Sequence, residues 1–367
     1  MRVKLEDVCE KGSSNLKQSD VVNLTGEYPI YGAAGYIGNV DFYHQEKPYV
    51  AIVKDGAGIG RTTLHPAKSS VIGTMQYLLP KDNVLPEYLC YVVRHMHLEK
   101  YFTGATIPHI YFRDYKNEKF NLASLDKQAE IVGILKKAES VILKRRQQLT
   151  ELDNLIKARF VEMFGDMLLN EMGWQEVHLD ALADVVSGIT KGRKVREAEL
   201  IEVPYMAVSN VKEGYIDWTT VKTIMATKQE IEQYRLLPYD VLMTEGGDPD
   251  KLGRGAVIAA PLENSIHQNH IFRVRLQLEK ILPVFFSQYL QNPKAKQYFL
   301  GCAKQTTGIA SINMKQLRSL PVLVPPIELQ EQFAAFVEQV DKSKVVVQKA
   351  LDEAQTLFDS LMQEYFG

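Results

Sequence analysis

An internal repeat constrains the fold of this chain most strongly, because a sequence that occurs twice must fold as two copies of one module. Val3 and Leu5 in RVKLEDVCE match Val177 and Leu179 in EVHLDALAD, 174 positions further on. Other matched pairs follow in the same order, and their separation grows along the chain to 202 positions. A growing separation is expected when the second copy has longer surface loops, where insertions cost little free energy.

The segment KDGAGIGR, residues 54–61, has three glycines after an apolar run, as phosphate-binding loops do. The second copy has EGGDPDKLGR at this position, which keeps the apolar run and the final Gly-Arg but loses the glycine spacing. The residues after the first copy, TTL, indicate a strand, whereas a phosphate-binding loop needs the N-terminus of a helix. We therefore interpret the segment as a glycine turn in a β-rich module, from which Lys54 and Arg61 can approach a phosphate backbone. The alternative of an enzyme with a nucleotide cofactor at this loop stays open, and a nucleotide-dependent thermal shift would favour it.

From residue 126 onward, apolar residues recur at alternating spacings of four and three positions, which is typical of a coiled-coil helix. The same seam recurs 202 positions later. Each helix begins near a glutamine, ends on Phe-Gly and carries one charged residue in its seam. The seams consist of Ile131, Leu135, Ala138, Ile142, Arg145, Leu149, Leu152, Ile156 and Met163, and of Phe333, Val337, Val340, Lys344, Val347, Leu351, Ala354, Phe358 and Tyr365. A helix with one apolar stripe needs a partner in water, so we expect the two to pair antiparallel. An ordinary hairpin within one domain, or a coil between copies of the chain, stays open.

The chain resembles the specificity subunit of type I restriction–modification systems over its whole length. The residues that carry this resemblance are GATIPHIYFRDYKNEKFNLASLDKQAEIV from Gly104 and TTGIASINMKQLRSLPVLVPPIELQEQFAAFV from Thr306. In each, a Gly/Thr-rich loop, an isoleucine-containing strand and a glutamine-bearing helix start follow in that order. The first copy departs from the pattern, since LASLDKQ lacks the double proline of VPPIELQ.

The resemblance implies a mixed α/β (α+β) fold with two target recognition domains, separated by two long antiparallel coiled-coil helices. It places the first recognition domain at residues 1–125, a central conserved spacer helix at 126–165, the second recognition domain at 166–325 and a C-terminal conserved spacer helix at 326–367. Each domain would read one half of a bipartite DNA site, which would be asymmetric because the two copies differ. The helices would set the spacing of the half-sites, since that spacing is a geometric property of the linked readers.

The resemblance also implies partners and excludes catalysis by the chain alone. The partners would be double-stranded DNA, two methyltransferase (modification) subunits and restriction (endonuclease/translocase) subunits. S-adenosylmethionine, ATP and magnesium would belong to those subunits, so no cofactor is expected in this chain. Two sequence signals agree: no Gly-x-Ser-x-Gly elbow occurs, and NPKA at 292–295 lacks the second proline and the aromatic residue of DNA amino-methyltransferases.

Candidate DNA contacts are loop residues of the types that pair with base edges and phosphates. In the first module they are Lys54, Arg61, Lys68, Gln76, His109, Tyr111 and Arg113. In the second module they are Asn210, Lys212, Arg254, His267, Gln268, Asn269, Lys304, Gln305 and Thr307. The HQNH run at 267–270 has the spacing of a metal pair, but its counterpart in the first copy is IGTM, so no metal site is expected.

Composition leaves one alternative to DNA binding open. The net charge is −2, which does not by itself indicate a nucleic-acid binder, although a basic patch can lie within a neutral average. A scaffold that assembles partner proteins through its helices therefore stays open. Three scattered cysteines and the absence of an apolar run of about 18 residues or a signal peptide favour the cytoplasm and no membrane span.

Overall fold

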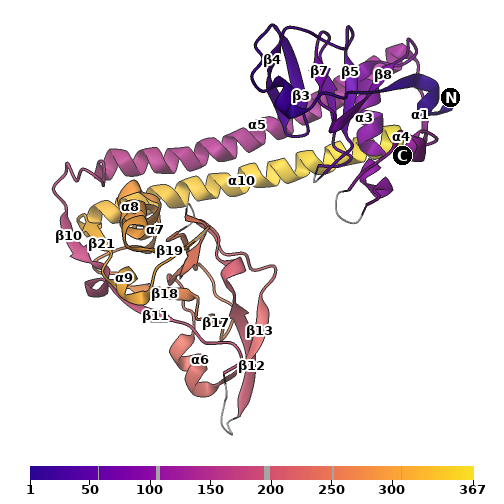
Figure 1. Cartoon of the computed structure of the whole chain (residues 1–367). Coiled ribbons are helices and arrows are strands. Elements are labelled where there is room, and N and C mark those ends of the chain that lie inside the picture. Colours follow the sequence, from indigo (N-terminus) through magenta and orange to yellow (C-terminus); the bar gives the residue numbers. More distant parts are fainter. Residues whose placement is uncertain (57, 105–107, 194–198, 250–251, 307) are drawn as a thin grey trace. The chain divides into compact units, whose positions relative to one another are not determined.

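The computed structural model describes residues 1–56, 58–104, 108–193, 199–249, 252–306 and 308–367 (Figure 1). The chain forms two compact units, which are Met1–Gln148 with Val347–Gly367, and Leu149–Val346. Each unit combines a globular module with one part of each of two long helices, so we call the globular parts the first and the second module. The bounds of the four domains expected from the sequence stay a prediction.

The two long helices are α5 (Leu125–Phe164) and α10 (Ile327–Phe366), with 40 residues each. At 1.5 Å per residue, each extends about 60 Å. In the second unit they run antiparallel: Lys344 Nζ lies 2.8 Å from Asp153 Oδ1, and further along α5 the rings of Phe160 and Phe333 are 5.5 Å apart. The predicted pair of long antiparallel helices is confirmed. Lys344, the charged seam residue, is held by this ion pair with the facing helix, which favours one register.

The first module is built on small β-sheets that contain both antiparallel and parallel strand pairs. Its strands are β1 (Arg2–Lys4), β2 (Cys9–Ser13), β3 (Tyr28–Gly32), β4 (Gly35–Val40), β5 (Tyr49–Val53), β6 (Thr62–His65), β7 (Ser70–Val71), β8 (Met75–Pro80) and β9 (Lys119–Asn121). The strand orders are β2-β8-β5-β6, β4-β3-β7 and β1-β9. The module also contains α1 (Leu5–Val8), α2 (Gln18–Val21), α3 (Pro86–His95), η1 (Leu98–Tyr101) and α4 (Phe112–Tyr115).

The second module repeats this topology. Its strands are β10 (Gln175–His178), β11 (Ala183–Ser187), β12 (Leu200–Met206), β13 (Lys222–Thr227), β14 (Val241–Thr244), β15 (Gly246–Gly247), β16 (Gly255–Val257), β17 (Ile266–His267), β18 (Ile271–Leu276), β19 (Lys304–Thr306), β20 (Ile309–Ser311) and β21 (Pro321–Val324). The orders β11-β18-β14-β16, β13-β12-β17 and β10-β21 correspond strand for strand to those of the first module. The module-specific helices are η2 (Leu179–Ala181), η3 (Val208–Asn210), α6 (Lys228–Tyr234), α7 (Pro283–Gln291), α8 (Pro293–Cys302) and α9 (Met314–Arg318). The matching sheets support the internal repeat at the level of topology.

A buried glutamine fastens each module to the start of a long helix. In the first unit Gln128 Oε1 accepts from the Leu85 amide at 2.8 Å, and its Nε2 donates to the carbonyls of Asn83 and Ala123 at 3.0 and 2.9 Å. Both of its polar atoms are therefore satisfied although the side chain is fully buried.

The second unit repeats this arrangement around Gln330. Its Oε1 accepts from the Leu282 amide at 2.9 Å, and Nε2 donates to the carbonyls of Lys280 and Pro325 at 3.2 and 2.8 Å. The glutamines noted in the sequence at the helix starts thus hold the segment that precedes α3 or α7 against the long helix.

Aromatic packing anchors the other end of each helix. The ring of Tyr88 on α3 lies 5.3 Å from Phe366 in the last turn of α10. In the second unit the ring of Phe285 on α7 lies 4.9 Å from Phe164 in the last turn of α5. The phenylalanines of both Phe-Gly ends are therefore core residues. The glycine that follows Phe164 has a φ of 74°, as expected at a helix end.

The KDGAGIGR segment closes a hairpin. Strands β5 and β6 pair antiparallel, and the amides of Val53 and Gly60 bond the carbonyls of Arg61 and Val53 at 3.0 and 2.9 Å. The φ of Gly60 is 82°, a conformation that favours glycine. Since β6 rather than a helix follows, the local structure matches the glycine-turn interpretation. Across the described ranges, no helix is both long and apolar enough to cross a bilayer.

Candidate nucleic-acid interface

In the first module, backbone pairing brings together two loops that are far apart in the sequence. Asp55, just after β5, pairs with His109 across an antiparallel bridge. The amide of Ile110 also donates to the carbonyl of Lys54 at 3.0 Å. Residues 54–56 of the glycine turn and residues 108–113 therefore lie on one surface, which we call the first paired-loop site.

The second module has the same pairing at the corresponding place. Gly246, just after β14, pairs with Ser311, and the amide of Ile312 donates to the carbonyl of Glu245 at 2.9 Å. We call this surface the second paired-loop site (residues 245–247, 304 and 308–312). The two copies thus share a backbone framework but differ in the side chains on it, since Glu245 takes the place of Lys54 and Ser311 that of His109.

A groove of about 530 Å³ lies over the first paired-loop site. Aromatic and cationic side chains form one wall: the rings of His109 and Tyr111 are 4.1 Å apart, and the Arg113 guanidinium lies 4.5 Å from the centre of the Tyr111 ring. Lys54 and Lys11 also line the groove. This combination of cations and exposed rings suits a phosphate-bearing ligand with flat bases.

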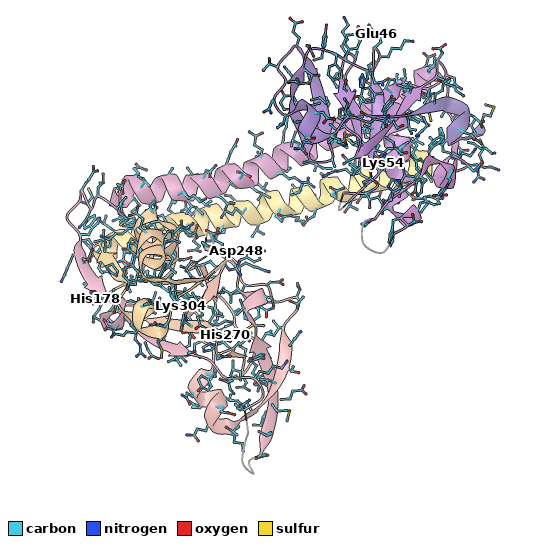
Figure 2. All side chains as sticks on the ribbon, in the orientation of Figure 1. Glu46, Lys54, His178, Asp248, His270 and Lys304 are labelled. Atoms are coloured by element: carbon cyan, nitrogen blue, oxygen red, sulfur yellow. The ribbon has the colours of Figure 1, made fainter. Side chains whose placement is uncertain are left out.

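A carboxylate lies beside these cations. Asp55 contacts His109 Nδ1 through Oδ1, and its Oδ2 is 4.0 Å from Lys54 Nζ. A second carboxylate, Asp114, lies 3.6 Å from Arg113 Nε through its Oδ1. The three cations that line the groove, Lys11, Lys54 and Arg113, still outnumber these two adjacent carboxylates. Figure 2 shows Lys54 on the first module.

The remaining candidates of the first module are placed differently. Gln76 lines the groove but is recessed, with 2% of its surface exposed, and its Nε2 finds no hydrogen-bond partner among the described residues. Arg61 is exposed and bonds the carbonyl of Ala33, and Lys68 is exposed in a turn with a φ of 54°. Neither Arg61 nor Lys68 is part of the groove lining.

At the second paired-loop site, His270 Nδ1 lies 2.5 Å from Glu245 Oε2 and both groups reach solvent. Lys304 is exposed on β19, and Figure 2 shows His270 and Lys304 on the second module. Asn269 is half-buried, and its main-chain carbonyl accepts from Ser187 Oγ at 2.6 Å. Gln268 Oε1 accepts from the Val208 amide at 3.4 Å, which leaves its Nε2 available.

Two other candidates of the second module are buried and bonded internally. Asn210 accepts from the Ala207 amide at 2.9 Å and donates to the Asp217 carbonyl at 3.0 Å, so it holds its own loop. His267 is fully buried, and its Nδ1 lies 3.0 Å from the Ile271 carbonyl. Burial lowers the pKa of the His267 imidazole to about 3, which keeps the ring neutral at pH 7.

The last candidates lie outside or beside the site. Lys212 is half-buried in the 211–216 turn, and Arg254 is half-buried after the second glycine turn. The side chain of Gln305 and residue Thr307 lie outside the described part of the chain. None of the candidate contacts is tested by the geometry, so all of them stay predictions.

The sequence-based reasoning missed Lys11 and Ser13. Both lie on β2, which pairs with β8 so that Ser13 is opposite Gln76. The charge and the hydroxyl were visible in CEKGS, but only the register of the two strands shows that they border the groove.

Residues 1–154 and 171–354 match the family described as "Type I restriction modification DNA specificity domain", one match on each module. The chain is 26% identical over 187 residues to the putative type I restriction enzyme MjaX specificity subunit of Methanocaldococcus jannaschii, covering 50% of this chain and 44% of that protein. It is 25% identical over 162 residues to the EcoKI specificity subunit of Escherichia coli K12, covering 44% of this chain and 35% of that protein. The chain thus spans less than half the length of these relatives.

A solved structure shares the fold over the whole chain. The type I restriction–modification S subunit from M. genitalium superposes with a TM-score of 0.60 at 15% identity, covering 100% of this chain and 96% of that one. The family match extends over far more than half of the residues, on both modules. This chain therefore belongs to the type I restriction modification DNA specificity domain family.

Proposed function

We propose that this chain is the sequence-specific DNA-binding subunit of a type I restriction–modification complex. Each module reads one half of a bipartite site. The observation that carries the proposal is that two copies of the specificity domain present the same paired-loop framework with different side chains. A shared framework supports a shared mode of docking, and the exchange of Lys54 for Glu245 and of His109 for Ser311 supports two different half-sites.

In this proposal the cations position the duplex and the polar side chains specify bases. Lys11, Lys54 and Arg113 border the first groove, where they would neutralise phosphates. Tyr111 and His109 offer flat rings, and the amides of Gln268 and Asn269 offer donors and acceptors to base edges in the second module. The other candidate contacts named from the sequence belong to the same proposal.

The long helices carry the second part of the proposal. They would set the spacing between the half-sites and offer docking surfaces to two methyltransferase subunits, with restriction subunits bound outside those. The chain itself would be non-catalytic, and S-adenosylmethionine, ATP and magnesium would be bound by the partner subunits. The three cysteines are free thiols, as expected of a protein that functions in a reducing cytoplasm.

The proposal is tested by selecting duplexes from a random library with the complex of this chain and its methyltransferase subunits, at several salt concentrations. We expect enrichment of a split, asymmetric motif and binding that weakens steeply as salt rises, because phosphate contacts release counterions. Assembly of the complex without enrichment of any duplex would contradict DNA reading. That outcome would favour the scaffold function that the near-neutral net charge of −2 leaves open.

A further inference from the structure

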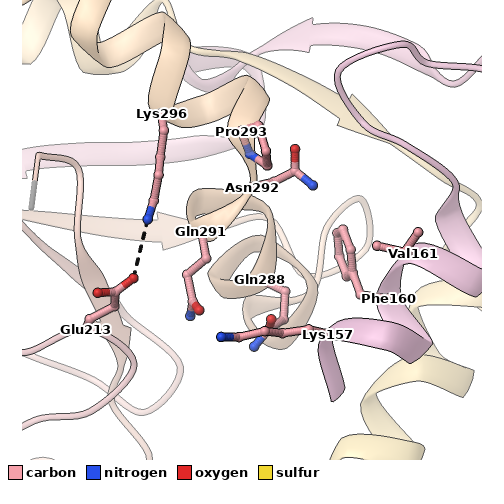
Figure 3. Close-up of a pocket in the computed structure, with 9 residues that line it drawn as sticks. All are labelled: Lys157, Phe160, Val161, Glu213, Gln288, Gln291, Asn292, Pro293 and Lys296. Atoms are coloured by element: carbon pink, nitrogen blue, oxygen red, sulfur yellow. Dashed lines mark ion pairs between the residues drawn. The ribbon is translucent and has the colours of Figure 1, made fainter. Parts of the chain in front are cut away.

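A polar pocket of about 250 Å³ lies between α5, α7 and the start of α8 within the second unit (Figure 3). We call it the α5–α8 pocket. Two lysines and three amides line it, together with one carboxylate: Lys157, Lys296, Gln288, Gln291, Asn292 and Glu213. Figure 3 shows that Lys157, Gln291 and Lys296 extend toward the same space. The floor is apolar and includes the buried ring of Phe160.

The cations of the pocket are poorly neutralised. No described residue forms an ion pair with Lys157, and Lys296 Nζ is 3.6 Å from Glu213 Oε1 with both side chains substantially exposed. A smaller adjoining hollow shares Glu213, Gln291 and Lys296 with the pocket and adds Arg254. The Nε of Arg254 is buried and has no hydrogen-bond partner within the described part of the chain. Three cations therefore face one carboxylate.

The neutral groups of the pocket are suited to an anion as well. Gln288 and Gln291 are one turn apart at the end of α7, so their amides lie on the same side of that helix. Asn292 caps α8, where its Oδ1 accepts from the Lys294 amide at 3.1 Å and its Nδ2 remains a donor. The positive end of the α8 dipole also lies here, which favours a negative charge.

The first module fills the corresponding position. Helices α3 and α7 each begin with a proline, and Tyr91 and Arg94 of α3 occupy the positions of Gln288 and Gln291. The Tyr91 hydroxyl and the Arg94 guanidinium bind the Glu139 carboxylate at 2.5 and 2.8 Å. The equivalent side chains are thus already bound to a carboxylate in the first copy. The open, cationic pocket is a feature of the second module.

We propose that the α5–α8 pocket binds a phosphate group of the DNA backbone and acts as a sequence-independent anchor for the second module. This inference rests on the proposed function. A backbone phosphodiester presents acceptor oxygens and one negative charge, which match the lysines, the amides and the helix end. The pocket is also continuous, through Glu213 and Lys296, with the hollow that Arg254 lines.

The test uses the complex of the full chain with its methyltransferase subunits and a duplex that carries its methylated motif. The double variant Lys157→Gln/Lys296→Gln removes the charges of the pocket. The control variant Lys222→Gln/Lys228→Gln removes two exposed lysines of the second module, on β13 and α6, that lie outside the pocket and outside both paired-loop sites. Binding is measured from about 50 to 200 mM salt, and assembly is checked by size-exclusion chromatography with light scattering.

We expect the magnitude of the slope of log K against log salt to fall by about 0.9 in the pocket variant, the value for one phosphate. The loss should be the same for duplexes with and without the motif, and the control variant should keep the full slope. If the pocket variant assembles and its slope is unchanged, the inference is overturned. The proposed function would still be supported in that case, provided that the wild-type complex binds DNA in a salt-dependent way. Failure of the pocket variant to assemble would assign the pocket to an acidic group of a partner protein and likewise overturn the inference. Absence of wild-type binding would instead reject the proposed function and this inference with it.

Discussion

Replacing Gln330 by leucine should destabilise the second unit strongly, because the glutamine satisfies three backbone groups at the start of α10. The Leu282 amide and the carbonyls of Lys280 and Pro325 would lose their partners in an environment that buries the side chain completely. Leaving a buried polar group unsatisfied costs about 1–3 kcal/mol. Burying the added apolar surface of leucine returns about 2 kcal/mol. We therefore expect the free energy of unfolding to fall by about 4 kcal/mol.

The matched control is Gln332→Leu, which makes the same exchange two positions further along at an exposed site of the same helix. An exposed substitution of this kind should change stability by no more than about 0.5 kcal/mol. Thermal unfolding followed by circular dichroism gives the size of each effect, and hydrogen exchange reports local protection of the Leu282 amide.

The repeat supplies a second control, since Gln128 makes the same three bonds in the first unit. Gln128→Leu should therefore cost a similar free energy and reduce the protection of the Leu85 amide instead. If Gln330→Leu were no more destabilising than Gln332→Leu, the reasoning that these glutamines fasten the modules would be refuted.

Three further outcomes are expected. The buried imidazole of His267 has a pKa of about 3, whereas an unfolded histidine titrates near its ordinary 6.5. Between these values the unfolded state binds one more proton than the folded state, so the stability of the protein should fall as pH drops below 6.5. Urea titrations at pH 7 and 5 should show a smaller pH effect in His267→Phe than in the wild type. The Glu230 carboxylate binds Arg193 and accepts from the amide of Thr227, the N-cap of α6, and these contacts lower its pKa to about 2. Its contribution to stability is therefore present above the unfolded value of 4.5 and is lost as pH falls toward 2, so Glu230→Gln should lower the unfolding midpoint at pH 7 and have little effect at pH 2. Lys54→Gln should weaken binding of the assembled complex to all duplexes and reduce the magnitude of the slope of log K against log salt by about 0.9, as measured by fluorescence anisotropy. An unchanged slope would show that Lys54 does not contact a phosphate.

The architecture could be predicted from the sequence because its signals are periodic and occur twice. The heptad seams place apolar residues on one stripe over many turns, and a stripe of this length has few alternatives to pairing with the other seam. The rising separation of matched pairs, from Val3 and Val177 to Ile110 and Ile312, indicated equivalent modules before any strand was assigned. The position of Gln128 and Gln330 was visible, but their role as clamps depends on where the chain returns to the helix.

The candidate site was predictable only loop by loop. The sequence pointed separately to the glycine turn and to the segment around His109, but the pairing of Asp55 with His109 is a long-range contact that no local pattern encodes. The sequence also did not indicate which polar residues are buried. Asn210 and His267 are polar residues near turns, yet tertiary packing buries them and directs their hydrogen bonds to groups inside the module. Lys157 gave no signal at all, because a lysine on a coiled-coil helix is ordinarily a solvated charge.

The most direct test of the central claim is genome-wide adenine methylation, measured by single-molecule sequencing in the host with this gene intact, deleted or carrying Tyr111→Ala with Arg113→Ala. The account predicts a split, asymmetric methylated motif that disappears on deletion. The double substitution in the first module should alter or abolish recognition of one half of that motif and leave the other half and the gap unchanged. A methylome that is identical with and without the gene, or a substitution that changes both halves, would contradict the claim that each module reads its own half-site.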